Sequence, residues 1–271
     1  LANLAAQQGL NILINIFYGV TVNAAAGIAN QVSTNVYGFI SNFQTAFQPQ
    51  IVKTYAAKEI ERFHKLIFQT SKFSYFMVIV LVMPILFTID GILEIWLKEV
   101  PEYTAIFCRL ILVYLSVEAT TAPLWMSVQA TGKIRNYQIL MASLIFLNFP
   151  IAYIVLNLGL PVYSVWIVRI IVNVLVMVAR CIYMKKNLEF PILAYLRAVI
   201  VPILSVTLAA LPVPILLHFT IHGFWNNLIV VGIVTFALTM ADVYFVGMNT
   251  HEKLMARNMI LNKIPFLRYK D

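Results

Sequence analysis

Residues 22–49 read VNAAAGIANQVSTNVYGFISNFQTAFQP, a stretch that is long enough to cross a bilayer and yet is rich in side-chain amides. At helical spacing its polar members fall on one stripe, and an apolar face lies opposite. The stripe consists of Asn23, Gly27, Asn30, Thr34, Tyr37, Ser41, Thr45 and Gln48. A carboxamide that faces lipid without a partner costs several kcal/mol, so this side must face protein or water. Because the stripe runs the full depth of a membrane, it predicts a hydrated path; hydrogen bonding between packed helices is the alternative.

The whole chain has the composition of an integral membrane protein. Hydrophobic residues make up 61% of it and charged residues 11%, whereas soluble domains carry about 25% charged residues. The mean hydropathy is +0.86. The net charge of +8 lies mainly in loops, which fits membrane topology better than nucleic-acid binding. Cys108 and Cys181 suggest neither a disulfide framework nor a metal site. We therefore predict an all-α polytopic membrane protein with no cofactor and no nucleic-acid partner.

Eight segments carry the roughly 20 apolar residues that one crossing needs. They are residues 1–19, 22–49, 73–97, 103–130, 136–157, 161–183, 193–218 and 224–247. This pattern predicts a bundle of about eight transmembrane helices. We expect a core lobe of about six helices in 1–183, two additional peripheral helices in 184–247, and a basic amphipathic cytoplasmic tail in 248–271. Residues 51–67 are also expected to form an amphipathic helix on the membrane surface.

Basic residues alternate between the connections of this predicted bundle. The connections at 50–72, 131–135 and 184–192 and the C-terminal tail hold most of them, and the intervening connections hold only Lys98. The positive-inside rule then places the basic set in the cytoplasm, and an even number of spans places both ends of the chain there. The chain lacks an initiator methionine and begins within an apolar run, so we expect it to be part of a longer protein.

Two ionisable residues inside predicted spans are hypotheses for function, because charge at this depth is costly. Arg169 shares a cationic face with Asn173 and Arg180, and a guanidinium suits a phosphate oxygen. Glu118 lies near the middle of its span, where a proton- or ion-coupling site and a structural partner are equal alternatives. For Arg169 the alternative to a phosphate contact is a buried ion pair, with Glu118 as a candidate partner.

The other ionisable residues point to structure rather than chemistry. Arg109 lies nine residues from Glu118, on the opposite helix face, and we expect it to snorkel toward the outer membrane surface. Asp90, Glu94 and Asp242 lie near span ends, where charge is better tolerated. The histidines have no metal spacing, and no phosphate loop, serine triad or paired carboxylate appears. We therefore do not expect an enzyme.

Three stretches resemble one family of transporters. Residues 23–56, NAAAGIANQVSTNVYGFISNFQTAFQPQIVKTYA, are similar to the seventh-to-eighth-span region of bacterial polysaccharide exporters. These are the O-antigen and capsule-unit flippases of the multidrug/oligosaccharidyl-lipid/polysaccharide exporter superfamily. ILEIWLKEVPEYTAIFCRL at 92–110 and QATGKIRNYQ at 129–138 resemble later motifs of the same family. The resemblance fades after about residue 185.

The resemblance implies a MATE-like two-lobe flippase of which this chain is the C-terminal lobe, with the N-terminal lobe of the same protein as its partner. Such proteins move undecaprenyl-pyrophosphate-linked oligosaccharide across the bacterial inner membrane by alternating access. The other partners would be membrane lipids, with H⁺ or Na⁺ as the coupling ion. From residue placement, we expect Glu118 to couple the ion and the following residues to form the substrate path: Asn23, Asn30, Thr34, Tyr37, Ser41, Gln48, Arg169 and Asn173.

Four other functions stay open at this point. A cation-coupled multidrug exporter would need acidic residues at the midplane, where this chain offers Glu118 against Arg169. A lipid II flippase is not separable from this half alone. A membrane-embedded enzyme of glycan assembly would need large catalytic loops, and the loops here are short. For a purely structural subunit, changes in the polar stripe would harm folding alone.

Overall fold

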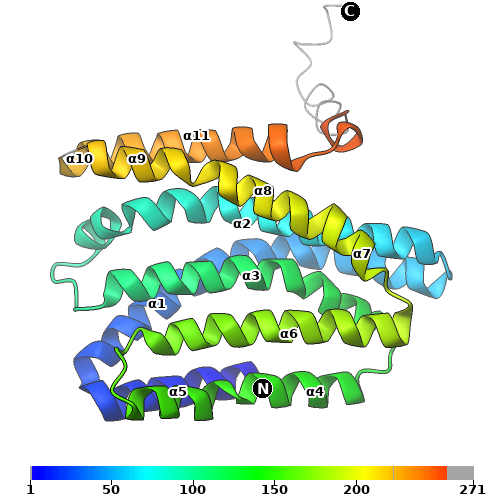
Figure 1. Ribbon diagram of the computed structural model, residues 1–271, viewed down its shortest axis with the longest axis horizontal. Coiled ribbons are helices and arrows are strands. Elements are labelled where there is room, and N and C mark those ends of the chain that lie inside the picture. The colour runs from blue at the N-terminus through cyan, green and yellow to red at the C-terminus, as the bar shows by residue number, and fades with distance from the viewer. Residues whose placement is uncertain (1, 222, 255–271) are drawn as a thin grey trace, which may run out of the picture.

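The computed structural model describes residues 2–221 and 223–254, with side chains from Ala6 onward, and this part of the chain consists of helices joined by short turns (Figure 1). The longer helices are α1 (Ala2–Ala56), α2 (Ile60–Trp96), α3 (Thr104–Ala130), α4 (Arg135–Phe146), α5 (Asn148–Asn157) and α6 (Ser164–Leu188). The last third consists of α7 (Ile192–Tyr195), η1 (Leu196–Ile200), α8 (Val201–Ala210), α9 (Pro212–Thr220), α10 (Phe224–Asn226), η2 (Asn227–Val231), α11 (Gly232–Asp242) and η3 (Val243–Gly247), where η1, η2 and η3 are π-helical. The described part contains no strand.

Seven helical stretches in the described part are long and apolar enough to cross a membrane. They are Ala6–Ala56, Ile60–Trp96, Thr104–Ala130, Arg135–Asn157, Ser164–Leu188, Ile192–Thr220 and Phe224–Gly247. The prediction of an all-α, multi-pass membrane protein is therefore confirmed. One of these stretches, Ala6–Ala56, holds the first two predicted segments, 1–19 and 22–49, within the single helix α1.

Gly19 divides α1 into two arms. Its φ of 81° and ψ of −177° belong to a region of backbone conformation that is essentially restricted to glycine. The N-terminal arm, residues 2–18, and the long arm, residues 20–56, run in opposite directions on either side of it (Figure 1, blue). The two arms correspond to the first two predicted segments, and the connection between them is reduced to the single residue Gly19.

The connections of the bundle alternate between its two ends. The turns at 57–59, 131–134 and 189–191 and the segment 248–254 lie at one end, on the right in Figure 1, and we call this the basic end. Gly19, the connections at 97–103 and 158–163 and the end of α9 lie at the other end. The basic connections predicted from the sequence thus gather at one end of the molecule. That this end faces the cytoplasm stays a prediction.

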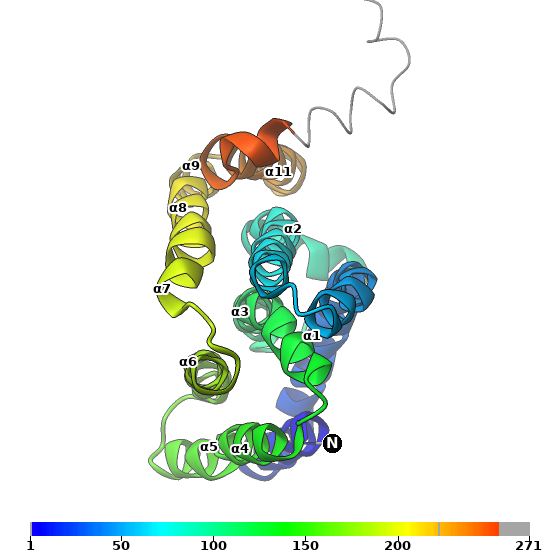
Figure 2. The same ribbon diagram turned by 90° about the vertical axis from the view of Figure 1, so that its right-hand side faces the viewer.

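The apolar face of the long arm packs into the interior of the bundle. Ala25 and Ala29 are buried in a cluster with residues of α2 and α3, and Val36 and Ile40 are buried in a second cluster with these helices. α6 packs on the other side of α3, and the α8–α11 layer packs against α2 (Figure 2). The polar stripe therefore faces away from the core that this chain builds.

Residues 51–67 do not form the predicted surface helix. α1 continues to Ala56 and α2 begins at Ile60, so this stretch is the corner between two long helices. Phe63 and Ile67 are buried in the core, and the Phe63 ring lies 5.2 Å from that of Tyr55. Helical spacing of apolar residues was read correctly, but these residues pack on protein rather than on lipid.

The predicted division of the chain is only partly open to comparison. The tail of 248–271 lies outside the described residues from 255 onward. The division into a core lobe of 1–183 and peripheral helices in 184–247 stays a prediction.

Candidate functional site

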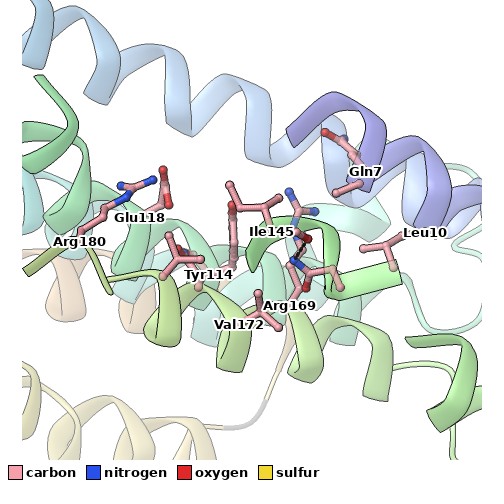
Figure 3. Close-up of a pocket in the computed structure, with 12 residues that line it drawn as sticks. Gln7, Leu10, Tyr114, Glu118, Ile145, Arg169, Val172 and Arg180 are labelled. Atoms are coloured by element: carbon pink, nitrogen blue, oxygen red, sulfur yellow. Dashed lines mark hydrogen bonds between the residues drawn. The ribbon is translucent and has the colours of Figure 1, made fainter. Parts of the chain in front are cut away.

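Two adjoining cavities lie between α1, α3, the α4–α5 pair and α6. The smaller has a volume of about 20 Å³ and the larger about 260 Å³, and Glu118, Ile145 and Arg180 line both. Arg169 and Tyr114 line the smaller cavity, and Figure 3 shows their side chains in the same cleft as Glu118 and Arg180. We call the two together the arginine cavity.

A proline in α3 determines how the wall of this cavity is built. Pro123 has no N–H, so the carbonyl oxygen of Ala119 loses its intrahelical partner. The Nε2 of Gln44 on α1 donates to this oxygen at 3.0 Å. The next carbonyl, of Thr120, accepts a hydrogen bond from the hydroxyl of Tyr195 at 3.3 Å. Backbone groups exposed at a kink thus hold α1 and α7 against α3, as an apolar surrounding requires.

Arg180 is tied to the same stretch of α3. Its Nη1 donates to the carbonyl oxygen of Thr121 at 3.2 Å, and the residue is only 6% exposed. Its Nε is buried and has no hydrogen-bond partner in the described part of the chain. One side of this guanidinium is therefore used to hold α6 on α3, and the other side keeps a free donor.

Arg169 lies eleven residues before Arg180 on α6 and is held by aromatic rings. Its guanidinium carbon is 4.3 Å from the ring centroid of Tyr114 and 5.4 Å from that of Trp166. Such cation–π contacts orient the planar guanidinium without consuming its N–H groups. The buried Nη1 of Arg169 has no hydrogen-bond partner among the described residues. Arg169 is thus positioned, while part of its donor capacity is unused.

Glu118 is half-buried and faces the two arginines without forming an ion pair with them. Figure 3 shows the guanidinium of Arg180 turned toward its carboxylate. The ion pairs of the described part, however, involve other residues. The partner of the carboxylate is the hydroxyl of Thr121, which donates to Oε2 at 3.4 Å. The ion pair between Arg169 and Glu118 that the sequence offered as an alternative is absent from this part of the chain.

The cavity therefore carries two cations and one anion, together with neutral amides. Asn173 is buried, and its Nδ2 donates to the carbonyl oxygen of Tyr114 at 3.5 Å. Asn148 is also buried, and its Oδ1 has no partner among the described residues. Free N–H donors on two guanidinium groups in a half-enclosed site suit the oxygens of a phosphate or carboxylate.

The structure brings together four of the predicted site residues. Arg169, Asn173 and Glu118 line the smaller cavity, and Tyr37 lines the larger one with Glu118. The remaining predicted path residues line neither cavity: Asn23, Asn30, Thr34, Ser41 and Gln48.

These remaining residues lie on the outward face of the long arm. Thr34 is exposed and its hydroxyl donates to the carbonyl oxygen of Asn30 at 2.9 Å, while Asn23, Asn30 and Ser41 are half-buried. Gln48 has a partner on another helix, because its Nε2 donates to Oε1 of Gln129 at 3.2 Å. Dry packing of the whole stripe against neighbouring helices does not occur within the described chain.

The sequence prediction missed three residues of this site. Arg180 was placed on the cationic face but not chosen as a site residue, although its spacing from Arg169 was a usable signal. Asn148 lies between apolar residues in the middle of its span. Gln7 lines the smaller cavity, whereas its neighbour Gln8 is exposed. A shift of one residue places a side chain about 100° around a helix, which composition alone does not resolve.

Arg109 has partners that the sequence did not predict. Its Nη2 pairs with the Asp90 carboxylate on α2, and its Nε donates to the carbonyl oxygen of Leu86 at 3.2 Å. It therefore links α3 to α2, while its snorkelling toward the outer membrane surface stays a prediction. Asp90, which the sequence left as a tolerated charge near a span end, is its partner.

Comparison of the chain with models of known families, with curated proteins and with solved structures finds no match.

Proposed function

We propose that this chain is part of a transporter that moves an anionic, lipid-linked glycan across a membrane, as expected for a flippase of undecaprenyl-pyrophosphate-linked oligosaccharide. The observation that carries the proposal is the pair of arginines on α6, each oriented by other contacts and each with an unpartnered buried N–H. An ion pair that served only stability would have its donors satisfied. The phosphate groups of such a substrate are the anion that these donors would meet.

The charge balance of the cavity favours anions over cations. Arg169 and Arg180 line it against the single carboxylate of Glu118. A cation exporter would need the reverse balance. Guanidinium groups hold phosphate oxygens with directed, charge-assisted hydrogen bonds, and amides such as Asn173 are neutral partners for sugar hydroxyls.

The outward polar face of the long arm supports a route for the glycan. A polar helix face at membrane depth must meet water or protein, and the core of this chain leaves that face partly exposed. In this proposal the face lines the interior of a two-lobe transporter, and the prenyl tail stays in lipid. Alternating access by rocking of the lobes would carry the head group past the arginines.

Glu118 would couple this movement to protons. When the carboxylate is charged, it repels an anion beside the arginines; when it takes up a proton, the repulsion ends. This assignment rests on its place in the arginine cavity and on the absence of an arginine partner within the described chain.

The test of the proposal is binding of undecaprenyl pyrophosphate to the purified chain and to its Arg169→Ala variant. A hydrogen bond to a charged group contributes about 1.5–3 kcal/mol, so we expect binding to weaken about 10- to 100-fold. Arg169→Lys keeps the charge and should lie between the two. Undecaprenol, which has no phosphate, should bind the wild type and Arg169→Ala equally.

Arg62→Ala is the matched control, because it removes an exposed arginine that lines neither part of the arginine cavity. The same variants should rank in the same order in a glycan-export complementation assay at equal membrane abundance. Unchanged binding and full export with Arg169→Ala would remove this residue from the mechanism.

A further inference from the structure

A third cavity lies at the basic end, outside the arginine cavity. Its volume is about 350 Å³, and it lies between α2, η1, the start of α8, η3 and the segment that follows η3. Three cations line it, Lys65 and Lys72 from α2 and Arg197 from η1, together with the single carboxylate of Glu252. We call it the basic-end cavity.

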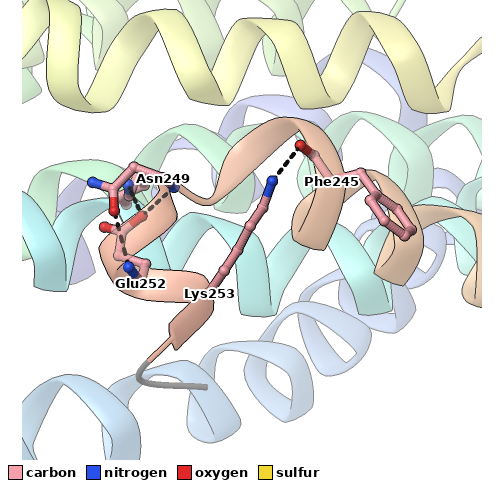
Figure 4. Close-up of polar contacts among 5 residues, drawn as sticks. Phe245, Asn249, Glu252 and Lys253 are labelled. Carbon is pink, nitrogen blue, oxygen red and sulfur yellow. Dashed lines mark hydrogen bonds and ion pairs between the residues drawn. The ribbon is translucent and has the colours of Figure 1, made fainter. Parts of the chain in front are cut away.

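One of its three cations is already neutralised. Lys72 and Glu252 form a buried ion pair of 2.6 Å in which each side chain is 5% exposed. Glu252 also accepts from the backbone N–H of Asn249 at 2.9 Å, and its own N–H donates to Oδ1 of Asn249 at 2.9 Å (Figure 4). This reciprocal pair is a capping box at the start of a helix. It fixes one wall of the cavity and consumes the only carboxylate among the lining residues.

Lys65 and Arg197 are left as free cations on two different walls. Both are exposed, and neither takes part in the ion pairs of the described chain. Gln69, one helical turn after Lys65, adds a neutral donor to the lining. The cavity therefore presents two unpaired positive charges to anything that enters it.

The backbone around the cavity is shaped to leave this space open. Both η1 and η3 contribute lining residues, and π-helical turns often mark functional sites. Gly247 ends η3 at a close approach to α2 and α8, since a Cβ there would lie 2.5 Å from the Phe76 ring and 2.8 Å from Val206. The chain thus packs tightly at Gly247, which itself lines the cavity.

Exposed apolar side chains are carried by the helices that line the cavity, although they are not among its lining residues. Leu196 precedes Arg197 and is 41% exposed, and Val201 is 55% exposed. Phe245, in η3, is 70% exposed. A ligand that meets this surface and the two cations together must have an anionic head and an apolar body.

We propose that the basic-end cavity binds the phosphate head group of an anionic membrane phospholipid, with Lys65 and Arg197 as its counter-charges. Basic pockets between transmembrane helices are suited to such head groups. The acyl chains lie along the exposed apolar residues of η1, α8 and η3. This site is separate from the arginine cavity and does not rest on the proposed transport function.

The test is native mass spectrometry of the full chain with phosphatidylglycerol, compared with zwitterionic phosphatidylcholine. We expect selective retention of phosphatidylglycerol. The double variant Lys65→Gln/Arg197→Gln should bind it about 30-fold more weakly, because each basic residue near a membrane surface contributes about 1 kcal/mol toward anionic lipid. Phosphatidylcholine binding should not change, which also shows that the variant is folded.

Lys53→Gln/Lys133→Gln is the control, since it removes two exposed charges from the basic end without touching the cavity lining. An equal loss in this control would show that bulk charge, not the cavity, attracts the lipid, and would overturn the proposal. Inorganic phosphate is the third arm. If it displaces phosphatidylglycerol at millimolar concentration, the site recognises a free phosphate and the lipid assignment is wrong.

Discussion

Two groups of buried charges in this protein are built in opposite ways. At the basic end, Lys72 and Glu252 form a closed pair in which the carboxylate also accepts a backbone hydrogen bond. In the arginine cavity, Arg169 and Arg180 face Glu118, no ion pair forms among the three within the described chain, and each guanidinium keeps a buried, unpartnered N–H. The difference separates charges that hold the fold from charges that are available to a ligand.

The orientation of each group by its surroundings supports this separation. Arg169 is placed by the rings of Tyr114 and Trp166, and Arg180 by the Thr121 carbonyl. These contacts fix the side chains and leave polar groups unsatisfied, which costs free energy. The lower stability of the free protein is accompanied by a binding site whose side chains are already oriented before the anion binds.

The largest expected effect is on the closed pair. Glu252→Gln leaves Lys72 buried without its counter-charge, and breaking a buried ion pair in this way destabilises a protein by about 3–5 kcal/mol. We expect unfolding at a clearly lower SDS concentration. The double variant Lys72→Met/Glu252→Gln should recover most of the loss, because no unpaired charge remains.

The exposed pair of Arg62 and Glu59 provides the control for this experiment. The Nη1 of Arg62 lies 3.1 Å from Oε2 of Glu59, and the two side chains are 65% and 47% exposed. Exposed pairs contribute about 0–1 kcal/mol to stability. Glu59→Gln should therefore hardly change the unfolding midpoint. If the unfolding midpoints of Glu252→Gln and Glu59→Gln are equal, the ion pair of Lys72 and Glu252 does not hold the fold, and its contrast with the arginine cavity is wrong.

The second expected effect concerns Gln44, a satisfied amide on the same helix as the open polar stripe. Gln44→Leu removes the donor to the Ala119 carbonyl that Pro123 leaves free, and an unsatisfied buried acceptor costs about 1–3 kcal/mol. Asn42→Leu is the matched control, since Asn42 is exposed and loses no such bond. Equal unfolding midpoints for the two variants would show that this bond does not hold α1 on α3.

Local patterns predicted the helices of this protein because apolar runs of membrane length and their polar interruptions are properties of neighbouring residues. The cationic face of α6 was predicted for the same reason, as Arg169, Asn173 and Arg180 repeat at helical spacing. The break between residues 19 and 22 was predicted, but not that Gly19 alone forms it, because a positive φ at one glycine is indistinguishable in sequence from a short loop.

Ion pairs between residues that are far apart in the sequence could not be predicted from local patterns. Arg109 and Asp90 are 19 residues apart, and Lys72 and Glu252 are 180 residues apart. Their pairing depends on how α2 meets α3 and the segment after η3, which periodicity does not encode. For the same reason the sequence could place Glu118 and Arg169 at membrane depth, yet it could not show that they share a cavity without pairing.

The smallest expected effect concerns Glu118, the carboxylate of the arginine cavity. Two unit charges about 10 Å apart at an effective dielectric constant near 20 repel by about 1.7 kcal/mol, so Glu118→Gln should strengthen binding of undecaprenyl pyrophosphate roughly tenfold at neutral pH.

Isothermal titration calorimetry of both proteins at neutral pH measures the effect, with Glu102→Gln as a control that removes an exposed carboxylate just before the start of α3. The unfolding midpoint of Glu118→Gln should match that of the wild type, because no ion pair is lost. A large drop in stability would mean that Glu118, like Glu252, holds the fold. Equal affinities for the two proteins would leave it a structural role only, since a carboxylate that repels the bound anion must weaken its binding.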